Sequence, residues 1–187
     1  MVDATGRPHH PVLMLDSTVI AAAVEALSSG EVVALPTETV YGLAADVSND
    51  AAIRRLFELK GRPQAVPLPV ALAHPDWLDR VAVTQDHRLQ PLTSRWWPGP
   101  LTLVCSARAD LNPIITAGLG TVAMRIPATE VTRAVIERFG RPVALTSANP
   151  HGEAPAMNAS QVISTFADAI AVVVGAAQEP LGIPSTI

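Results

Sequence analysis

The sequence has one cysteine, few aromatic residues and none of the familiar nucleotide-binding loops. Cys105 is the only cysteine in 187 residues, which excludes a disulfide within the chain, and its apolar setting "LTLVCSA" predicts a small core residue. Aromatic residues make up 4% of the chain, too few to predict the stacking platforms of single-strand binders. Neither G-x-x-x-x-G-K-[ST] nor G-x-G-x-x-G occurs, so any nucleotide needs a different cradle.

The chain also lacks a positive charge excess and long apolar runs. Its formal net charge is −4, so a polyanion must bind at a local basic cluster. No apolar run approaches the roughly 20 residues that cross a bilayer, and the N-terminus lacks the pattern of a secretory signal. We therefore expect a soluble, cytoplasmic protein with no membrane partner. No metal site is predicted from side chains, because the histidines lack metal-ligand spacing.

Strands and helices are expected to alternate in one domain, residues 16–187, after a flexible N-terminus, residues 1–15. Helices are predicted over 16–29, 49–61, 128–140 and 158–168, with a further helical region over about 76–97 that is broken near Pro91. Strands are predicted over 31–36, 66–73, 101–107, 121–127, 142–148 and 169–175. Pro69 indicates that 66–73 is an edge strand or an irregular segment. The pattern favours an α/β fold with helices covering a twisted, mixed sheet.

Three polar clusters follow apolar segments, where α/β proteins generally build ligand sites. They are Thr37, Glu38, Thr39 and Tyr41; "KGRP" at 60–63; and "TSANPHG" at 146–152. Each cluster alone also fits a structural role, as a cap, a turn or a charge at a helix end. Their combination favours a site.

The residue types in these clusters suit an anionic ligand. Lys60 and Arg62 offer an ammonium and a planar fork of donors to one anion. Ser147 and Asn149 add a hydroxyl and an amide suited to phosphate oxygens or to water on a magnesium ion. Arg125 ends an apolar strand, and an ion pair within the fold is its alternative explanation.

The order of the motifs resembles one known family. The series is "PTETVYGLAAD", "KGRP" with "PLPV", "WWPGPLTLV", "VAMRIP", "LTSANPHGEAP" and "GIPSTI". From about Ser17 to the last residue, it is similar to the YrdC/Sua5 family of threonylcarbamoyl-AMP synthases.

The resemblance implies a nucleotidyltransferase that joins L-threonine, bicarbonate and ATP, accompanied by Mg²⁺, into threonylcarbamoyl-AMP and pyrophosphate. The product would serve the t6A modification of adenosine 37 in tRNA, through downstream tRNA threonylcarbamoyl-transfer proteins. The implied fold is a single-domain, YrdC-like open twisted sheet around a basic concave cavity, with a tendency to bind double-stranded RNA.

The resemblance also assigns residues to the two substrates. Those implied for threonine and carbamate are Thr37, Tyr41, Arg125 and Ser185. Those implied for ATP are Lys60, Arg62, Ser147 and Asn149. Lys60 and Arg62 are further implied to be catalytic, because carbamate attack on the α-phosphorus builds charge that cations stabilise.

Two features depart from the family pattern. Many members have an asparagine and a histidine where this sequence has Val66 and Ala71, and His74 lies three residues too late to replace that histidine. Members also continue after "STI" to an arginine that reaches the nucleotide, whereas this sequence ends at Ile187. It also contains no counterpart of the C-terminal domain of longer Sua5 proteins. Two alternatives therefore stay open: a double-stranded RNA-binding or maturation protein without turnover, and a carbamoyl-transfer paralogue with another acceptor.

Overall fold

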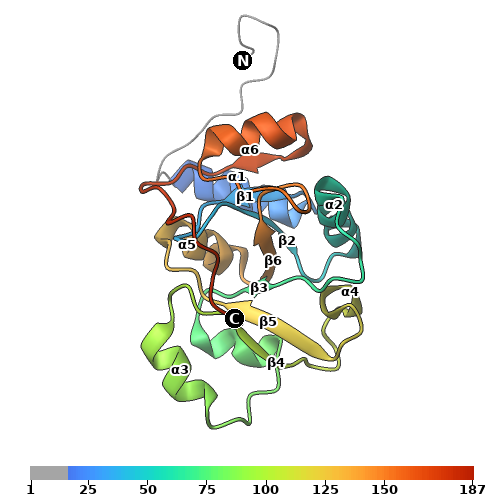
Figure 1. Ribbon diagram of the computed structural model, residues 1–187, viewed down its shortest axis with the longest axis vertical. Coiled ribbons are helices and arrows are strands. Elements are labelled where there is room, and N and C mark those ends of the chain that lie inside the picture. Colours follow the sequence, from blue (N-terminus) through green and yellow to red (C-terminus); the bar gives the residue numbers. More distant parts are fainter. Residues whose placement is uncertain (1–16) are drawn as a thin grey trace, which may run out of the picture.

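Seven strands form one mixed sheet in the computed structural model, which describes residues 17–187 apart from the side chain of Asp168 (Figure 1). The sheet order is β4-β5-β3-β6-β2-β1-β7. The strands are β1 (Val33–Leu35), β2 (Gly42–Asp46), β3 (Val70–Ala71), β4 (Leu103–Ser106), β5 (Thr121–Arg125), β6 (Val143–Ser147) and β7 (Val172–Val173). The pairs β1–β7 and β3–β5 are parallel and the other neighbours are antiparallel, which confirms the predicted mixed α/β sheet. The predicted N-terminal segment, residues 1–15, lies outside the described residues.

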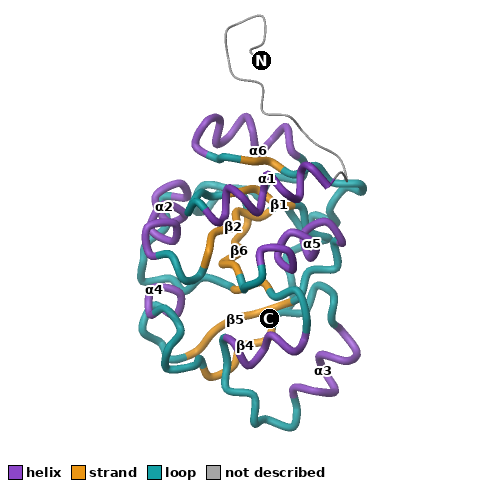
Figure 2. The backbone as a smooth tube through the Cα atoms, turned by 180° about the vertical axis from the view of Figure 1, so that it is seen from behind, coloured by secondary structure: helices purple, strands orange, loops and turns teal. Residues whose placement is uncertain are grey.

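Helices cover one face of the sheet and leave part of the other face open. In the view from behind, α1 and α5 lie in front of β1, β2 and β6 (Figure 2), and these two helices pack against each other. The helices are α1 (Ser17–Ser28), α2 (Asp50–Lys60), α3 (Leu89–Trp96), α4 (Pro113–Thr116), α5 (Glu130–Phe139) and α6 (Ala159–Phe166), with 3-10 turns η1 (Pro75–Arg80) and η2 (Ala167–Ala169). Apolar residues of the strands and of the helix faces form one core cluster.

Helix α2 has defined ends, and its C-terminal end positions a predicted cluster. Asn49 accepts a hydrogen bond from the backbone N–H of Ala52 at 3.1 Å and caps the first turn. Gly61 has φ of 57°, the left-handed conformation that glycine adopts without steric cost, and its N–H closes the last turn. Lys60 and Arg62 therefore leave the helix on either side of a fixed turn.

Strand β2 was not predicted, although it is central to the sheet. All five residues of "GLAAD" are buried, and the segment lacks the β-branched residues and the alternation by which strands are recognised. At its start, a side chain on Gly42 would place Cβ 2.6 Å from Leu145 Cδ1 of β6. Glycine therefore permits the close approach of β2 and β6.

Two predicted segments differ in the structure. The strand predicted over 66–73 shortens to β3, which lies between β5 and β6 rather than at an edge. Pro69 is tolerated there because its carbonyl, not an N–H, pairs with Leu145 N at 2.9 Å. The break predicted near Pro91 falls instead at residues 81–88, where Val83 N pairs with the Ser106 carbonyl. Pro91 lies in the first turn of α3, where a missing N–H costs little.

The end of the chain returns to the sheet beside the start of β4. Thr102 N donates to the Thr186 carbonyl at 2.7 Å, and Thr186 N donates to the Pro100 carbonyl at 2.9 Å. The C-terminal end consequently lies near β5 in Figure 1. Among the described residues, no helix has the length and apolar character needed to cross a membrane.

Candidate active site

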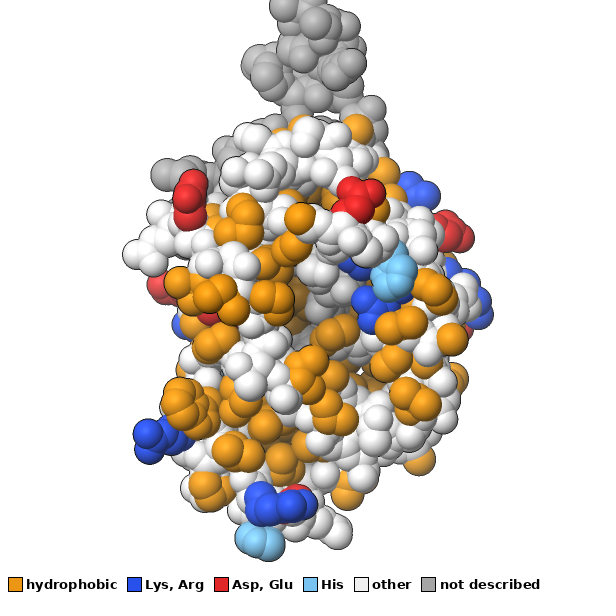
Figure 3. All heavy atoms as spheres, in the orientation of Figure 1, with side chains coloured by type: hydrophobic (Ala, Val, Ile, Leu, Met, Phe, Trp, Pro, Cys, Tyr) orange, Lys and Arg blue, Asp and Glu red, His pale blue; other side chains and the backbone are white. Residues whose placement is uncertain are grey.

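Most of the predicted site residues meet in one cavity of about 270 Å³. The molecular face seen in Figure 3 is hollowed near its centre, and basic side chains border the hollow on one side. The cavity is lined by Thr37, Thr39, Val40, Tyr41, Gly42, Arg62, Pro69, Thr102, Arg125, Leu145, Thr146, Ser147, Pro184, Ser185 and Ile187. Segments far apart in the sequence therefore build a single hydroxyl-rich pocket.

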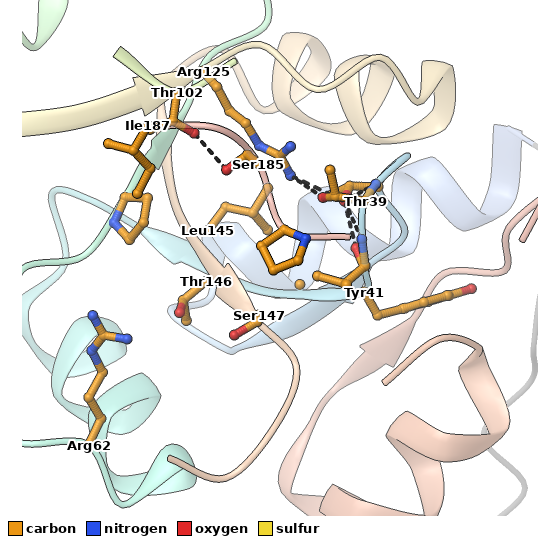
Figure 4. A pocket seen from close by; sticks show the side chains of 15 residues that line it. Thr39, Tyr41, Arg62, Thr102, Arg125, Leu145, Thr146, Ser147, Ser185 and Ile187 are labelled. Carbon is orange, nitrogen blue, oxygen red and sulfur yellow. Dashed lines mark hydrogen bonds between the residues drawn. The ribbon is translucent and has the colours of Figure 1, made fainter. Parts of the chain in front are cut away.

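Two arginines give the cavity its cationic groups. Arg62 and Arg125 lie on opposite sides, with Thr146 and Ser147 between them (Figure 4). Burial lowers the pKa of both guanidinium groups, and the charge of Glu38 partly opposes this effect on Arg125. Both are taken as charged at neutral pH because the guanidinium is the most basic of the common side-chain groups. The pocket can thus hold one anionic group at each side.

The Thr37 hydroxyl organises the loop between β1 and β2. It donates to the Val40 carbonyl at 2.6 Å and accepts from the backbone N–H groups of Thr39 and Val40, each at 3.2 Å. Arg125 Nη2 donates to the hydroxyls of Thr37 and Thr39, each at 3.1 Å. The hydroxyl proton of Thr37 is therefore already used within the fold, and its predicted contact with substrate stays a prediction.

Thr37→Ala is expected to lower the free energy of unfolding by about 2 kcal/mol, because two buried N–H groups lose their acceptor. Thr37→Ser keeps the oxygen and should lose less than about 1 kcal/mol, since only a methyl group is removed. Urea denaturation followed by circular dichroism measures both values. Equal stability of the two variants would contradict this role of the hydroxyl.

Tyr41 borders the cavity, but its ring points away from it (Figure 4). The side chain is buried, and burial raises the pKa of its hydroxyl to about 12, partly opposed by a hydrogen bond with the backbone of Ala176. Tyr41 N also donates to the Ala156 carbonyl at 3.0 Å. These contacts give Tyr41 a place in the core, while its predicted role toward threonine and carbamate stays a prediction.

Lys60 and Asn149 do not line the cavity but bind each other behind it. Lys60 is 2% exposed, and its Nζ donates to the carbonyl of Asn149 at 2.7 Å, to Asn149 Oδ1 at 3.1 Å and to the carbonyl of Ser147. Asn149 Nδ2 donates to the Glu153 carbonyl at 2.6 Å. Burial, and secondarily the charge of Arg62, lowers the pKa of Lys60 to about 8. The ammonium therefore fixes the end of β6 at Ser147 and the start of the loop that follows it.

Two serines complete the lining on opposite walls. Ser147 comes from the end of β6, and Ser185 comes from the C-terminal segment. The hydroxyls of Ser185 and Thr102 lie 2.9 Å apart (Figure 4). Thr102 was missed by sequence reasoning, although a polar residue within the apolar run "LTLV" was an available signal.

The positions that depart from the family pattern lie apart from the cavity lining. Ala71 is buried in β3 and Val66 is half-buried. His74 is exposed, and its Nε2 lies 3.2 Å from a carboxylate oxygen of Glu137. It does not line the pocket.

The ion pair considered for Arg125 is present, and the same residue lines the cavity. Arg125 Nη1 lies 2.9 Å from Glu38 Oε1. The structural and functional explanations of Arg125 are therefore compatible. Within residues 17–187, no three His, Cys, Asp or Glu side chains with described positions gather as a possible metal site.

Several known proteins are similar in sequence to this chain. Threonylcarbamoyl-AMP synthase from Pyrococcus abyssi is 38% identical over 161 residues, which cover 86% of this chain and 47% of that protein. The synthase from Bacillus subtilis is 39% identical over 169 residues, which cover 90% and 49%. This chain thus spans about half the length of these two relatives. It spans more of the synthase from Idiomarina loihiensis, with 35% identity over 80% of this chain and 81% of that protein.

Solved structures and a family model agree with these matches. A crystal structure of P. abyssi Sua5 complexed with L-threonine superposes with a TM-score of 0.86 at 38% identity, over 89% of this chain and 49% of that chain. Escherichia coli YciO superposes with a TM-score of 0.79 at 18% identity, over 88% and 81%, and supports the fold alone. The Sua5/YciO/YrdC model, described as "Telomere recombination", matches residues 25–187. The chain belongs to the Sua5/YciO/YrdC family.

Proposed function

We propose that the protein is a threonylcarbamoyl-AMP synthase, a nucleotidyltransferase acting on L-threonine, bicarbonate and ATP. The observation that carries the proposal is the hydroxyl-rich cavity with an arginine on each side, in a chain 38% identical to the P. abyssi synthase. The P. abyssi Sua5, which shares this fold and is 38% identical to this chain, has been crystallised with L-threonine. Such a cavity suits two anionic partners that react with each other.

The chemistry requires positioning more than a covalent nucleophile. The threonine amine and bicarbonate form a carbamate with loss of water. A carbamate oxygen then attacks the α-phosphorus of ATP, a new P–O bond forms, and the bond to pyrophosphate breaks. Charge develops on phosphoryl oxygens and on the leaving pyrophosphate, so fixed cations lower the barrier.

The proposed roles follow the two sides of the cavity. Arg125 and Ser185 hold the amino acid, and Arg62 and Ser147 hold the ATP phosphates. Lys60 and Asn149 support Ser147 from behind, so their contribution to ATP binding is through the loop. Mg²⁺ arrives with ATP and is bound mainly by phosphate oxygens and water, the ligands that it prefers.

The product is the activated group for the t6A modification of tRNA adenosine 37, which a downstream tRNA threonylcarbamoyl-transfer protein would complete in the cytoplasm. Binding of tRNA or double-stranded RNA by this chain is a separate proposal. The net charge of −4 restricts such binding to a local surface.

One assay tests the proposal against its alternatives. The protein is incubated with ATP, Mg²⁺, bicarbonate and each of several labelled amino acids, and pyrophosphate and adenylate are measured. Turnover with L-threonine alone is the expected result. Turnover with a different acceptor would indicate a paralogue, and no turnover together with salt-sensitive RNA binding would indicate an RNA-binding protein.

A further inference from the structure

Glu38 joins two walls of the candidate active site through its two carboxylate oxygens. Oε1 accepts from Arg125 Nη1 at 2.9 Å, and Oε2 accepts from the backbone N–H of Ala128 at 2.8 Å. The side chains are largely buried, with 12% of Arg125 and 16% of Glu38 exposed. One carboxylate thus connects the loop after β1 to both the end of β5 and the loop that follows it.

This contact crosses a large part of the sheet. In the strand order, β3, β6 and β2 lie between β5 and β1. Arg125 nevertheless reaches the loop after β1, where it contacts Thr37, Glu38 and Thr39. This side-chain bridge holds the loop over the cavity together with two backbone hydrogen bonds, from Leu181 N to the Glu38 carbonyl at 2.8 Å and from Gly182 N to the Thr39 carbonyl at 2.9 Å.

The bridge also fixes the direction of the guanidinium. Arg125 has five N–H groups, of which one on Nη1 donates to Glu38 and the two on Nη2 donate to the hydroxyls of Thr37 and Thr39. The second Nη1 proton and Nε–H have no hydrogen-bond acceptor among the described residues. They are the donors left for a ligand. They lie on different edges of the guanidinium, so each can donate a single hydrogen bond to a carboxylate oxygen, and a fixed guanidinium keeps the donor direction constant.

Glu38 itself stands outside the cavity that Arg125 lines. It borders a neighbouring cavity of about 450 Å³, lined also by Ala128, Glu130 and Glu179, whereas Thr37 borders both. An unrestrained arginine side chain between the two cavities would lose rotamer freedom on binding a ligand, and this loss of entropy weakens affinity. The carboxylate removes that freedom in advance, from the side away from the ligand.

We propose that Glu38 is a positioning residue that holds the Arg125 guanidinium in the direction needed to bind the carboxylate of the amino-acid substrate. This inference rests on the proposed function for the identity of the ligand. The restraint of Arg125 by Glu38 does not depend on any substrate.

The test combines ligand affinity with the motion of the guanidinium. Glu38→Ala is expected to weaken L-threonine binding at least tenfold by calorimetry, while ATP affinity changes less than twofold. Glu38→Gln keeps an oxygen for Arg125 and should recover most of the L-threonine affinity. Glu130→Ala is the matched control, because it removes an exposed carboxylate from the neighbouring cavity and should leave both affinities unchanged. Equal weakening of both ligands, or no recovery with Gln, would overturn the proposal.

Nitrogen-15 NMR of arginine side chains supplies the readout that needs no substrate. In the wild type, the Nη protons of Arg125 should give separate signals because rotation of the group is slow. In Glu38→Ala the two Nη1 protons, which lose their acceptor, should average, whereas separate Nη1 signals in that variant would overturn the restraint. If the wild type binds no L-threonine but its Arg125 signals respond to Glu38→Ala, the proposed function fails and the positioning by Glu38 stands.

Discussion

Arg62→Ala is expected to reduce pyrophosphate release at saturating L-threonine by a factor of about 100 or more, the cost of losing one well-placed donor to a developing anion. Arg62 lines the cavity opposite Arg125, and its Nη2 is tied to the Pro67 carbonyl at 2.8 Å. Its Nε is buried without a hydrogen-bond partner among the described residues. An oxygen of a bound ligand would satisfy a group that is otherwise costly to bury.

The controls for Arg62 separate a specific contact from general charge. Arg54→Ala removes an exposed arginine of α2 whose only described side-chain contact is a 3.4 Å hydrogen bond to Gln64, so turnover should be unchanged. Arg62→Lys restores a charge without the planar fork and should recover part of the activity. Turnover of Arg62→Ala within threefold of the wild type would remove Arg62 from the mechanism.

Lys60→Met is expected to lower the free energy of unfolding by about 3 kcal/mol, because three acceptors, on Ser147 at the end of β6 and on Asn149 in the loop after it, lose a charged donor together. For a chain of this size, the melting temperature should fall by roughly 6–12 °C. Adenylate formation should fall as well, since the Ser147 carbonyl loses its hydrogen bond from Lys60. Differential scanning calorimetry and the pyrophosphate assay measure the two effects.

Asn149→Ala shows how much of the Lys60 effect lies in one acceptor. It removes Oδ1 and Nδ2 but leaves both backbone carbonyls bound to Nζ, so a loss of about 1–2 kcal/mol is expected. If Lys60→Met were as stable as the wild type and still inactive, Lys60 would act at the phosphates directly, as the sequence resemblance implied.

Most helices and strands could be predicted because their signals are local, although the short helix α4 was not predicted. Asn49 and Gly61 mark the ends of α2 in the sequence as they do in the structure. Strand β2 could not be predicted, because its five buried residues are recognisable only from their pairing with β6. The position of β3 inside the sheet likewise depends on partners more than 50 residues away.

The residue types of the candidate site could be predicted, but not which of the side chains line the cavity and which lie behind it. Arg62, Arg125 and Ser185 line the cavity, as a cluster of hydrogen-bonding groups suggests. Lys60 lies behind it because the last turn of α2 faces the carbonyls of the loop after β6, and no spacing rule contains that information. The sequence pattern assigns Glu38 to the first polar cluster without a role of its own, because its partner Arg125 is 87 residues away.

The buried position of Lys60 gives the protein an internal chemical probe. It is the only lysine in the sequence, so an amine-specific reagent has one side-chain target besides the N-terminal amine. Burial lowers the pKa of this amine to about 8, and exposure of the amine would return the pKa toward the ordinary lysine value, so acylation of the exposed amine needs alkaline buffer. Acylation is blocked while the loop after β6 stays closed over it, so the labelling rate reports how often that loop opens.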